Sequence, residues 1–369
     1  MKMKIEAIEM RHICMRLKAP FRTSFGVEHD RHCLILRVLS EGLEGWGECV
    51  AGQFPGYSYE TVGTAWHVLS EFFFPPLLGN ELRDIQSFRS TNKGIRGHPL
   101  ARAALEMALW DLKAKRQDCS LAEILGGITH RVSVGVSVGI QPSAAELMNV
   151  IAGYIEAGYG RVKLKIEPGN DVEAVQTVRS AYPELPLWVD ANSAYTLDEA
   201  HVFEALDEMD LMLIEQPLAA DDLIDHSKLQ ARIRTPICLD ESIRGLRHMQ
   251  QALEIDACRV LNMKQARVGG LQEALDIHTL CFGEDVPVWC GGMLETGIGR
   301  AANLALASLP GFRLPADISA TDRYYTEDIA NPRFTLNVDS TIDVPQGPGL
   351  GVTVDSDALE RFSLRTVTF

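Results

Sequence analysis

Charged residues end a series of short apolar runs in the middle of the chain, at nearly constant spacing. Lys165, Asp190, Glu215 and Asp240 follow one another at steps of 25 residues, and Lys264 comes 24 residues later. This period fits one buried strand, one helix and two short loops, which is the repeating unit of a parallel (β/α) barrel. Because active sites of such barrels lie where the strands end, we expect the five charged side chains to meet at one mouth.

The three acids, Asp190, Glu215 and Asp240, offer only carboxylate oxygens, with no histidine or cysteine among them. Oxygen donors suit a hard divalent cation, so the pattern predicts a Mg²⁺ site at which Mn²⁺ can substitute. A single acid of this kind could equally cap a helix or pair with an arginine. Three in register favour the metal, because buried charges are costly unless they are paired or metal-bound.

The lysines flank these acids in the sequence. Lys163 and Lys165 are two residues apart in an extended run, so their side chains lie on the same side of the sheet. Two ammonium groups on one face should lower each other's pKa and favour a neutral amine. Lys264 reaches the site from the opposite wall. The sequence therefore predicts a divalent cation with a base on each side, which suits removal of a proton next to a carboxylate or carbonyl.

The amino-acid composition limits the classes of molecule that the protein can bind. With 35 basic and 50 acidic side chains the net charge is −15, which argues against nucleic acid or an anionic membrane. No apolar run approaches the length of a membrane span, and charge occurs too early for a secretory signal. The eight cysteines show no pairing pattern, which is typical of reduced thiols. We expect a cytoplasmic protein that acts on a small molecule.

The chain divides by pattern into three segments. Residues 1–127 lack the long period and predict an α+β domain, residues 128–318 predict the barrel, and residues 319–369 predict a tail that returns to the first domain. The strands expected in the first domain cover residues 5–17, 32–38 and 46–48, and its helices residues 60–73, 100–115 and 120–125.

Two aromatic segments interrupt the first domain. Residues 20–26 and 52–57 are expected loops that carry Phe21, Phe25, Phe54 and Tyr57. Such aromatics can simply pack locally. If the first domain covers the barrel, the two loops are the natural lid over its mouth.

Within the barrel, the alternating valines from Val132 to Val138 predict the first strand. Ser143 and Thr196 each precede a glutamate by three residues, so each predicts a helix start with a capping box. The expected seventh strand covers residues 286–290, and a short eighth strand residues 313–317.

Two short motifs suggest other functions. Residues 135–139 match G-x-S-x-G and would make Ser137 a hydrolase nucleophile, although that motif needs a sharp turn and Ser137 lies inside a strand pattern. Ser137 could instead offer a hydroxyl to a substrate or fill space. Residues 297–302 match G-x-G-x-x-A of dinucleotide folds, but at the wrong end of the strand series. A helix N-terminus there could hold a substrate carboxylate.

Taken together, the motifs resemble the enolase superfamily in its muconate-lactonizing subgroup. They are Lys163-Leu164-Lys165, Val189-Asp190-Ala191-Asn192, Ile214-Glu215-Gln216-Pro217, Leu239-Asp240-Glu241-Ser242 and Asn262-Met263-Lys264. The resemblance implies a (β/α)₇β barrel of the TIM type with an α+β cap formed by both termini. It also implies that the three acids bind Mg²⁺, that Lys165 and Lys264 are the acid/base pair, and that Lys163 supports Lys165.

Two differences from other enolase-superfamily enzymes limit which activities fit this sequence. Cys290-Gly291-Gly292 replaces the histidine of the mandelate-racemase type, and Asp317 is only one of the two acids that hold a free ammonium in dipeptide epimerases. Residues 291–300 are similar to the o-succinylbenzoate synthase and N-succinylamino acid racemase family. This implies dehydration in menaquinone synthesis, racemisation of N-acyl amino acids, or both.

Other functions stay open at this point: another cycloisomerase or epimerase of the muconate-lactonizing type, a serine hydrolase, and a barrel without catalysis. We expect a small carboxylate substrate and a homo-oligomer. The expected substrate contacts are Ser137, Asn192, Gly292, Met293 and the four lid aromatics. Arg267 is also counted among the expected substrate contacts: it could enter the mouth and lower the pKa of Lys264, or it could be an ordinary surface arginine.

Overall fold

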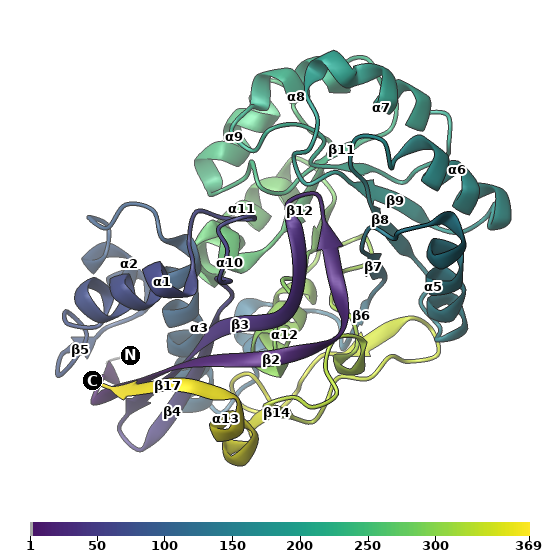
Figure 1. The fold of residues 1–369 in the computed structure, drawn as a ribbon. Helices are drawn as coiled ribbons and strands as arrows, with labels where there is room; N and C mark the ends of the chain where they lie inside the picture. The colour runs from purple at the N-terminus through teal and green to yellow at the C-terminus, as the bar shows by residue number, and fades with distance from the viewer. Residues whose placement is uncertain (1–2) are drawn as a thin grey trace.

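The computed structural model describes residues 3–369. Met1 and Lys2, on which the expectation about the N-terminus partly rests, lie outside the described residues. The chain forms a barrel of parallel strands and a cap built on a long antiparallel sheet (Figure 1). In Figure 1 the purple strands β2 and β3 run from the cap towards the barrel. No helix within the described part is long and apolar enough to cross a membrane.

The cap sheet contains antiparallel strands in the order β17-β2-β3-β4. They cover Ser363–Thr368, Ala7–Thr23, Gly26–Ser40 and Leu43–Cys49. Short strands β1 (Met3–Lys4) and β5 (Glu81–Leu82) pair beside it. Because β17 pairs with β2, the C-terminal tail lies against the N-terminal strands. The domain boundaries at 127 and 318 stay predictions.

The aromatic segment 20–26 is not a loop, contrary to the sequence expectation. Residues 21–23 pair with residues 26–28, so β2 and β3 continue as a hairpin to a tight turn. The sequence hides this extension, because the outer hairpin is held by backbone hydrogen bonds and lacks a regular apolar alternation. Its tip reaches the barrel, where Ser24 Oγ lies 3.4 Å from the backbone oxygen of Asn192.

The cap helices pack on one face of this sheet. They are α1 (Val62–Val68), η1 (Leu69–Phe73), α2 (Ile85–Thr91), α3 (Pro99–Arg116) and α4 (Leu121–Leu125). The three expected helices are confirmed, whereas α2 was not expected. Helix α3 crosses β4 at close range: a Cβ added to Gly47 would lie 2.0 Å from the Ala104 carbonyl oxygen, so only glycine fits there.

Parallel strands form the barrel sheet in sequence order. They are β7 (Val136–Val138), β8 (Val162–Lys165), β9 (Leu187–Asp190), β10 (Ile214–Glu215), β11 (Ile237–Leu239), β12 (Val260–Met263) and β13 (Val288–Cys290). The register places Lys165 and Glu215 on either side of Asp190. The charged strand ends are therefore neighbours in space, as the constant period predicts.

The expected eighth strand is an extended segment that closes the ring without forming a continuous strand. Ala316 forms a parallel bridge with Val134 beside β7, and Phe312 forms one with Val288 of β13. Asp317 N donates to the backbone oxygen of Cys290 at 2.9 Å. This segment thus joins the two edges of the sheet and carries Asp317 into the barrel.

Helices surround the barrel. They are α5 (Ala144–Glu156), α6 (Val172–Ala181), η2 (Leu197–Glu199), α7 (Ala200–Leu206), α8 (Leu223–Gln230), α9 (Leu246–Glu254), α10 (Gln265–Val268), α11 (Leu271–Gly283) and α12 (Gly297–Ala307). The two predicted helix starts are confirmed. Ser143 Oγ accepts from the backbone N–H of Glu146 at 3.2 Å, and Thr196 forms a reciprocal capping box with Glu199.

The valine run expected as one strand is divided in two. Strand β6 (Arg131–Ser133) pairs antiparallel with β15 (Thr341–Asp343) of the tail, and only β7 belongs to the barrel. The break falls near Gly135, where an added Cβ would lie 2.3 Å from Arg161 Nε. The alternation of valines continues across the break, so the pattern alone could not reveal it.

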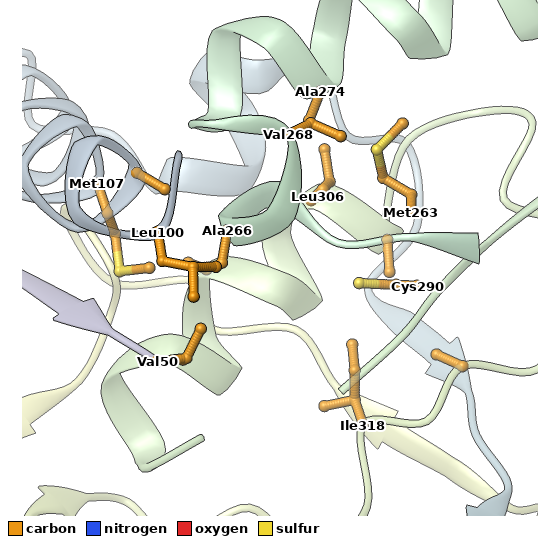
Figure 2. Close-up of a cluster of buried hydrophobic side chains, with 14 of the residues drawn as sticks. Val50, Leu100, Met107, Met263, Ala266, Val268, Ala274, Cys290, Leu306 and Ile318 are labelled. Carbon is orange, nitrogen blue, oxygen red and sulfur yellow. The ribbon is translucent and has the colours of Figure 1, made fainter. Parts of the chain in front are cut away.

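The rest of the tail covers the side of the cap and barrel. It contains η3 (Thr321–Arg323), β14 (Ala330–Asn331), β16 (Thr353–Val354) and α13 (Ser356–Phe362). A large core joins apolar side chains of cap and barrel, and a separate smaller cluster consists of Trp188, Leu213, Cys238, Val260 and Trp289 of the barrel. Figure 2 shows Leu100 and Met107 of α3 beside Ala266 of α10, and burying a side chain such as Leu100 contributes roughly 1.5–3 kcal/mol.

Two buried carboxylates of the cap also bind the ends of barrel helices. Glu48 of β4 accepts hydrogen bonds from the backbone N–H groups of Thr296 and Gly299 at 3.0 and 2.9 Å, at the start of α12. Glu106 of α3 accepts from the backbone N–H of Gln272 at 2.7 Å, at the start of α11. The first N–H groups of a helix lack partners within it, so these acids satisfy them from another part of the chain.

Candidate active site

Three buried carboxylates meet where neighbouring strands end. Asp190 ends β9, Glu215 ends β10 and Asp240 directly follows β11, and each is at most 1% exposed. Lys163 bridges two of them, with Nζ 2.8 Å from Glu215 Oε2 and 3.1 Å from Asp190 Oδ2. Asn262 Nδ2 donates to the other oxygen of Glu215 at 2.6 Å. The acids are therefore held by a cation from β8 and an amide from β12, on either side of them in the sheet.

The donor set fits a hard divalent cation. Within residues 3–369, no three His, Cys, Asp or Glu side chains converge closely enough to coordinate a metal as they stand. Lysine ammonium groups lie among the carboxylates instead. Burial is the main cause that raises the pKa of Glu215 to about 8, and the charge of Asp190 adds to it. The carboxylates thus repel one another, and three such oxygen ligands are what Mg²⁺ or Mn²⁺ prefers.

Two lysines approach the acids from opposite sides. Lys165 Nζ lies 2.6 Å from Asp190 Oδ2 and 2.6 Å from Asn192 Oδ1. Lys264 Nζ lies 2.7 Å from Asp240 Oδ2 and 4.4 Å from the centre of the Tyr57 ring. Both lysines line the same cavity, so the arrangement of one amine on each side of a charged centre agrees with the sequence analysis.

The expectation that Lys163 and Lys165 lower each other's pKa is wrong for Lys163. Burial works to lower the pKa of Lys163, but Asp317, Glu215 and Asp190 together raise it well above its ordinary value. Lys163 is 3% exposed and lies 2.6 Å from Asp317 Oδ2. It is a permanent cation that ties three acids together.

Arg267 enters the site but does not line the main cavity. Its Nη1 donates to Asp240 Oδ1, and its Nε donates to the backbone oxygen of Ile243 at 2.7 Å. Burial works to lower the pKa of Lys264, but Asp240, Tyr57 and Glu241 raise it. The expected net lowering of this pKa is therefore wrong. Arg267 instead shares Asp240 with Lys264.

A cavity of about 380 Å³ lies between the barrel mouth and the cap. The predicted site residues that line it are Phe21, Phe25, Phe54, Tyr57, Ser137, Lys163, Lys165, Asn192, Lys264, Gly292 and Met293. Phe54 is 72% exposed and Phe25 38% exposed, as expected for side chains at an opening. Sequence reasoning missed further lining residues from the hairpin, the last barrel segments and the tail, among them Thr23, Glu28, Arg31, Leu294, Asp317 and Tyr324.

Asp317 and Arg161 form an ion pair that the sequence did not reveal. Arg161 Nη1 lies 2.7 Å from Asp317 Oδ1, and its guanidinium carbon lies 3.9 Å from the centre of the Trp188 ring. Burial raises the pKa of Asp317, but Lys163 and Arg161 outweigh it and lower the value to about 2. The one available signal was the position of Asp317 at the end of the expected eighth strand.

The hydrolase motif lacks the surroundings that it needs. Ser137 lies in the middle of β7, paired with Lys163 of β8, and not on a turn. Its Oγ is buried and has no hydrogen-bond partner among the described residues. A serine nucleophile requires a base within hydrogen-bond reach, so a free hydroxyl facing a cavity suits substrate contact better.

The glycine motif at residues 297–302 is also accounted for structurally. It starts α12, where the backbone N–H groups of Gly297, Ile298 and Gly299 donate to Asp328, Thr296 and Glu48 at 3.0, 3.2 and 2.9 Å. A Cβ on Gly299 would lie 2.8 Å from Glu48 Oε2, which explains the glycine. The suggestion that this helix end holds a substrate carboxylate is therefore wrong, because a protein carboxylate already lies there.

Two protein families match consecutive parts of the chain. Residues 146–358 match the family described as enolase C-terminal domain-like, and residues 5–126 match the mandelate racemase / muconate lactonizing enzyme N-terminal domain. The chain belongs to the enolase superfamily. This confirms the (β/α)₇β barrel with its α+β cap. It also shows that the protein is an enzyme of this superfamily, which excludes the barrel without catalysis.

Relatives with two different names match this enolase-superfamily enzyme over nearly its whole length. An o-succinylbenzoate synthase of Geobacillus kaustophilus is 49% identical over 364 residues, which are 98% of this chain and 97% of that protein. An N-succinylamino acid racemase of Thermus thermophilus is 48% identical over 98% of both chains. The crystal structure of an enolase-superfamily member from Listeria innocua superposes with a TM-score of 0.95 at 40% identity, covering 100% of this chain and 99% of that one.

These comparisons indicate the general type of reaction, but the relatives carry the names of two different activities. Enzymes of the mandelate racemase and muconate lactonizing families generally depend on Mg²⁺ and act on small carboxylates. The donor set at Asp190, Glu215 and Asp240 agrees with such an ion. The two names among the relatives describe a lyase and an isomerase.

Proposed function

We propose that the enzyme removes a proton next to a substrate carboxylate, with Asp190, Glu215 and Asp240 holding Mg²⁺. The observation that carries this proposal is the placement of Lys165 and Lys264 on opposite sides of the three acids, both facing one cavity. Bound there, the ion would supply positive charge that stabilises an enolate.

The chain's own groups then have distinct roles. Lys165 donates two hydrogen bonds, to Asp190 and Asn192, which leaves the third position of its amine for the substrate. Lys264 is held mainly by Asp240 and is covered by the Tyr57 ring. Lys163 stays charged and keeps the carboxylates in place. Lys165 and Lys264 thus act as acid and base on opposite faces of the substrate carbon.

The substrates that fit best are N-succinylamino acids, for racemisation, and the precursor of o-succinylbenzoate, for dehydration. Both reactions begin with removal of a proton next to a carboxylate. Relatives named for each activity are almost equally similar to this chain, so similarity supports a site that serves both. The aromatic side chains of Phe21, Phe25 and Phe54 give apolar cover for a bulky side chain.

The state of Asp317 supports an acylated substrate over a free amine. Asp317 is already paired with two cations, Lys163 and Arg161, so its negative charge is largely neutralised before a substrate ammonium could bind. Ser137 Oγ and the backbone of Gly292 instead offer neutral polar groups that suit an amide or a carboxylate oxygen. An N-succinyl group contains both an amide and a carboxylate.

The test is an assay of the purified enzyme with Mg²⁺ on three substrates. N-succinylphenylalanine should lose optical rotation, the cyclohexadiene precursor should give o-succinylbenzoate by absorbance, and free phenylalanine should react at least about 100-fold more slowly. Free phenylalanine processed as fast as its succinyl form would contradict the pocket assignment. Full turnover in excess chelator would contradict the metal.

We further propose that the enzyme works in the cytoplasm as a homo-oligomer. All eight cysteines are free thiols, and Cys33, Cys49, Cys238, Cys281 and Cys290 are 0% exposed. A reducing compartment keeps such thiols free. Light scattering coupled to gel filtration measures the mass directly, and a mass of one chain would contradict the oligomer.

A further inference from the structure

Asn192 occupies a strained backbone position between two charged side chains. It follows β9 with φ of 43°, and Ser193 after it has φ of 64°, both in the left-handed region. The backbone N–H of Asn192 donates to Asp190 Oδ1 at 3.0 Å. Asparagine tolerates this conformation better than most residues, and such strain persists where the surroundings hold it in place.

The side chain of Asn192 connects Lys165 with Glu241. Its Oδ1 lies 2.6 Å from Lys165 Nζ, and its Nδ2 lies 2.9 Å from Glu241 Oε1. Glu241 follows Asp240 at the end of β11, so this connection passes over β10. Glu241 is 7% exposed, and its second oxygen has no hydrogen-bond partner among the described residues.

These contacts fix which way the amide points. Glu241 Oε1 accepts the hydrogen bond at this contact, and only the nitrogen of the amide can donate it, so Asn192 turns its nitrogen towards Glu241. The carbonyl oxygen then faces Lys165. With the amide reversed, its N–H₂ group would face the lysine amine, and one N–H of Lys165 would lose its acceptor.

We infer that Glu241 is a positioning residue for Lys165, acting through Asn192. Asp190 and Asn192 each accept one hydrogen bond from the Lys165 amine, so its remaining position points into the cavity. Glu241 keeps Asn192 in the orientation that this requires. Among residues 3–369, the contacts of Lys264 are Asp240 and the Tyr57 ring, and no amide connects it to Glu241. The inference rests on the proposed two-lysine function and adds a residue whose hydrogen-bond chain reaches only one of the two lysines. The charge of Glu241 also acts on Lys264, and the variants Glu241→Leu and Glu241→Gln remove that charge equally, so they differ only in the hydrogen bond.

The first experiment compares the two faces. Proton NMR in D₂O at saturating Mg²⁺ follows α-proton exchange of each enantiomer of N-succinylphenylalanine. The enantiomer still exchanged by Lys264→Ala is the one that Lys165 serves. The quantity to compare is the ratio of the two exchange rates, because a change in metal affinity affects both faces and cancels in the ratio.

The two Glu241 variants differ in whether they keep an acceptor. Glu241→Leu removes it and should slow exchange on the Lys165 face by about 10–100-fold relative to the Lys264 face. Glu241→Gln keeps an acceptor of the same shape and should restore the ratio to within about threefold of wild type. Equal loss on both faces in Glu241→Leu, or a ratio in Glu241→Gln that matches Glu241→Leu, would overturn the positioning role.

A second measurement does not depend on activity. Crystal structures of the two variants should show Asn192 Oδ1 within hydrogen-bond distance of Lys165 in Glu241→Gln and displaced from it in Glu241→Leu. An undisturbed contact in Glu241→Leu would overturn the inference. If wild-type enzyme exchanged neither enantiomer, the racemase proposal would fail alone, and these structures would still decide the role of Glu241.

Discussion

The two walls of the active site hold their lysines in different ways. On one wall, Lys165 lies between a carboxylate and the amide of Asn192, with Lys163, Asp317 and Arg161 behind it. On the other wall, Lys264 shares Asp240 with a second cation, Arg267, and with the Tyr57 hydroxyl, which donates to Asp240 Oδ1 at 2.8 Å.

Two lysines with similar proposed roles are thus held by different kinds of contact. The two groups that accept hydrogen bonds from Lys165 both belong to the barrel. The Lys264 wall includes Tyr57 of the cap segment 52–57, whose hydroxyl donates to Asp240 and whose ring lies against Lys264. Variants that alter one wall alone therefore test whether the two lysines differ in the way described.

The largest effect is expected for variants of the three carboxylates that lie between the two walls. Asp190→Asn, Glu215→Gln and Asp240→Asn each replace a carboxylate by an amide of the same shape, so they should abolish both activities and weaken Mg²⁺ binding. Calorimetric titration with Mg²⁺ and the optical assay measure the two effects. Circular dichroism controls for folding, and substantial turnover in any of the three would contradict the metal site.

The next largest effect is expected for variants that remove one of the two lysines. Lys264→Ala should stop racemisation in both directions while Lys165 still exchanges the α-proton of its own enantiomer with D₂O, and Lys165→Ala should show the mirror preference. Each change should cost about 10²–10⁴ in turnover, as loss of a positioned acid or base does. Proton NMR with each pure enantiomer decides, and a single variant that exchanges both enantiomers equally would refute two-sided chemistry.

The support behind Lys165 should appear in acid stability. The pKa of Asp317 is about 2 when folded, against an ordinary 3.8, so its ionised form favours the folded state. This contribution, about 2 kcal/mol, is present above roughly pH 4 and is lost as the pH falls towards 2. Urea unfolding of wild type and Asp317→Asn should therefore show a difference that shrinks over this range. A difference independent of pH would contradict the assignment.

A smaller effect concerns Arg267 on the Lys264 wall. Removing its charge with Arg267→Gln leaves Lys264 as the only cation on Asp240 among the described residues, so the pKa of Lys264 should rise. The limb of the pH-rate profile that requires neutral Lys264 should move to higher pH by about one unit. Arg267→Lys keeps the charge and is the matched control. A profile that is unchanged in Arg267→Gln would show that Arg267 only holds Asp240 in place.

The sequence predicts the parts of this site that follow a local rule. Strand ends 25 residues apart must become neighbours in a parallel barrel, so the spacing alone brings Asp190, Glu215, Asp240 and the lysines to one mouth. The placement of the aromatic segments at the mouth also followed from the idea of a cap. The metal and acid/base roles of these residues stay predictions.

What the sequence could not predict depends on pairing between distant segments. Arg161 and Asp317 are 156 residues apart and meet only because the segment before Asp317 closes the barrel. The hairpin beyond residue 20 is held by backbone hydrogen bonds, which leave no side-chain pattern. The direction of the Lys163 pKa was misjudged because three acids, not Lys165, dominate its surroundings.

The acids at 48 and 106 have a consequence for building hybrid proteins. They satisfy the first N–H groups of α12 and α11 from a different part of the chain. A cap transplanted from a relative that lacks these acids would leave buried N–H groups orphaned, at a cost of about 1–3 kcal/mol each. Cap and barrel are therefore not interchangeable modules, and a functional chimera has to inherit Glu48 with α12 and Glu106 with α11.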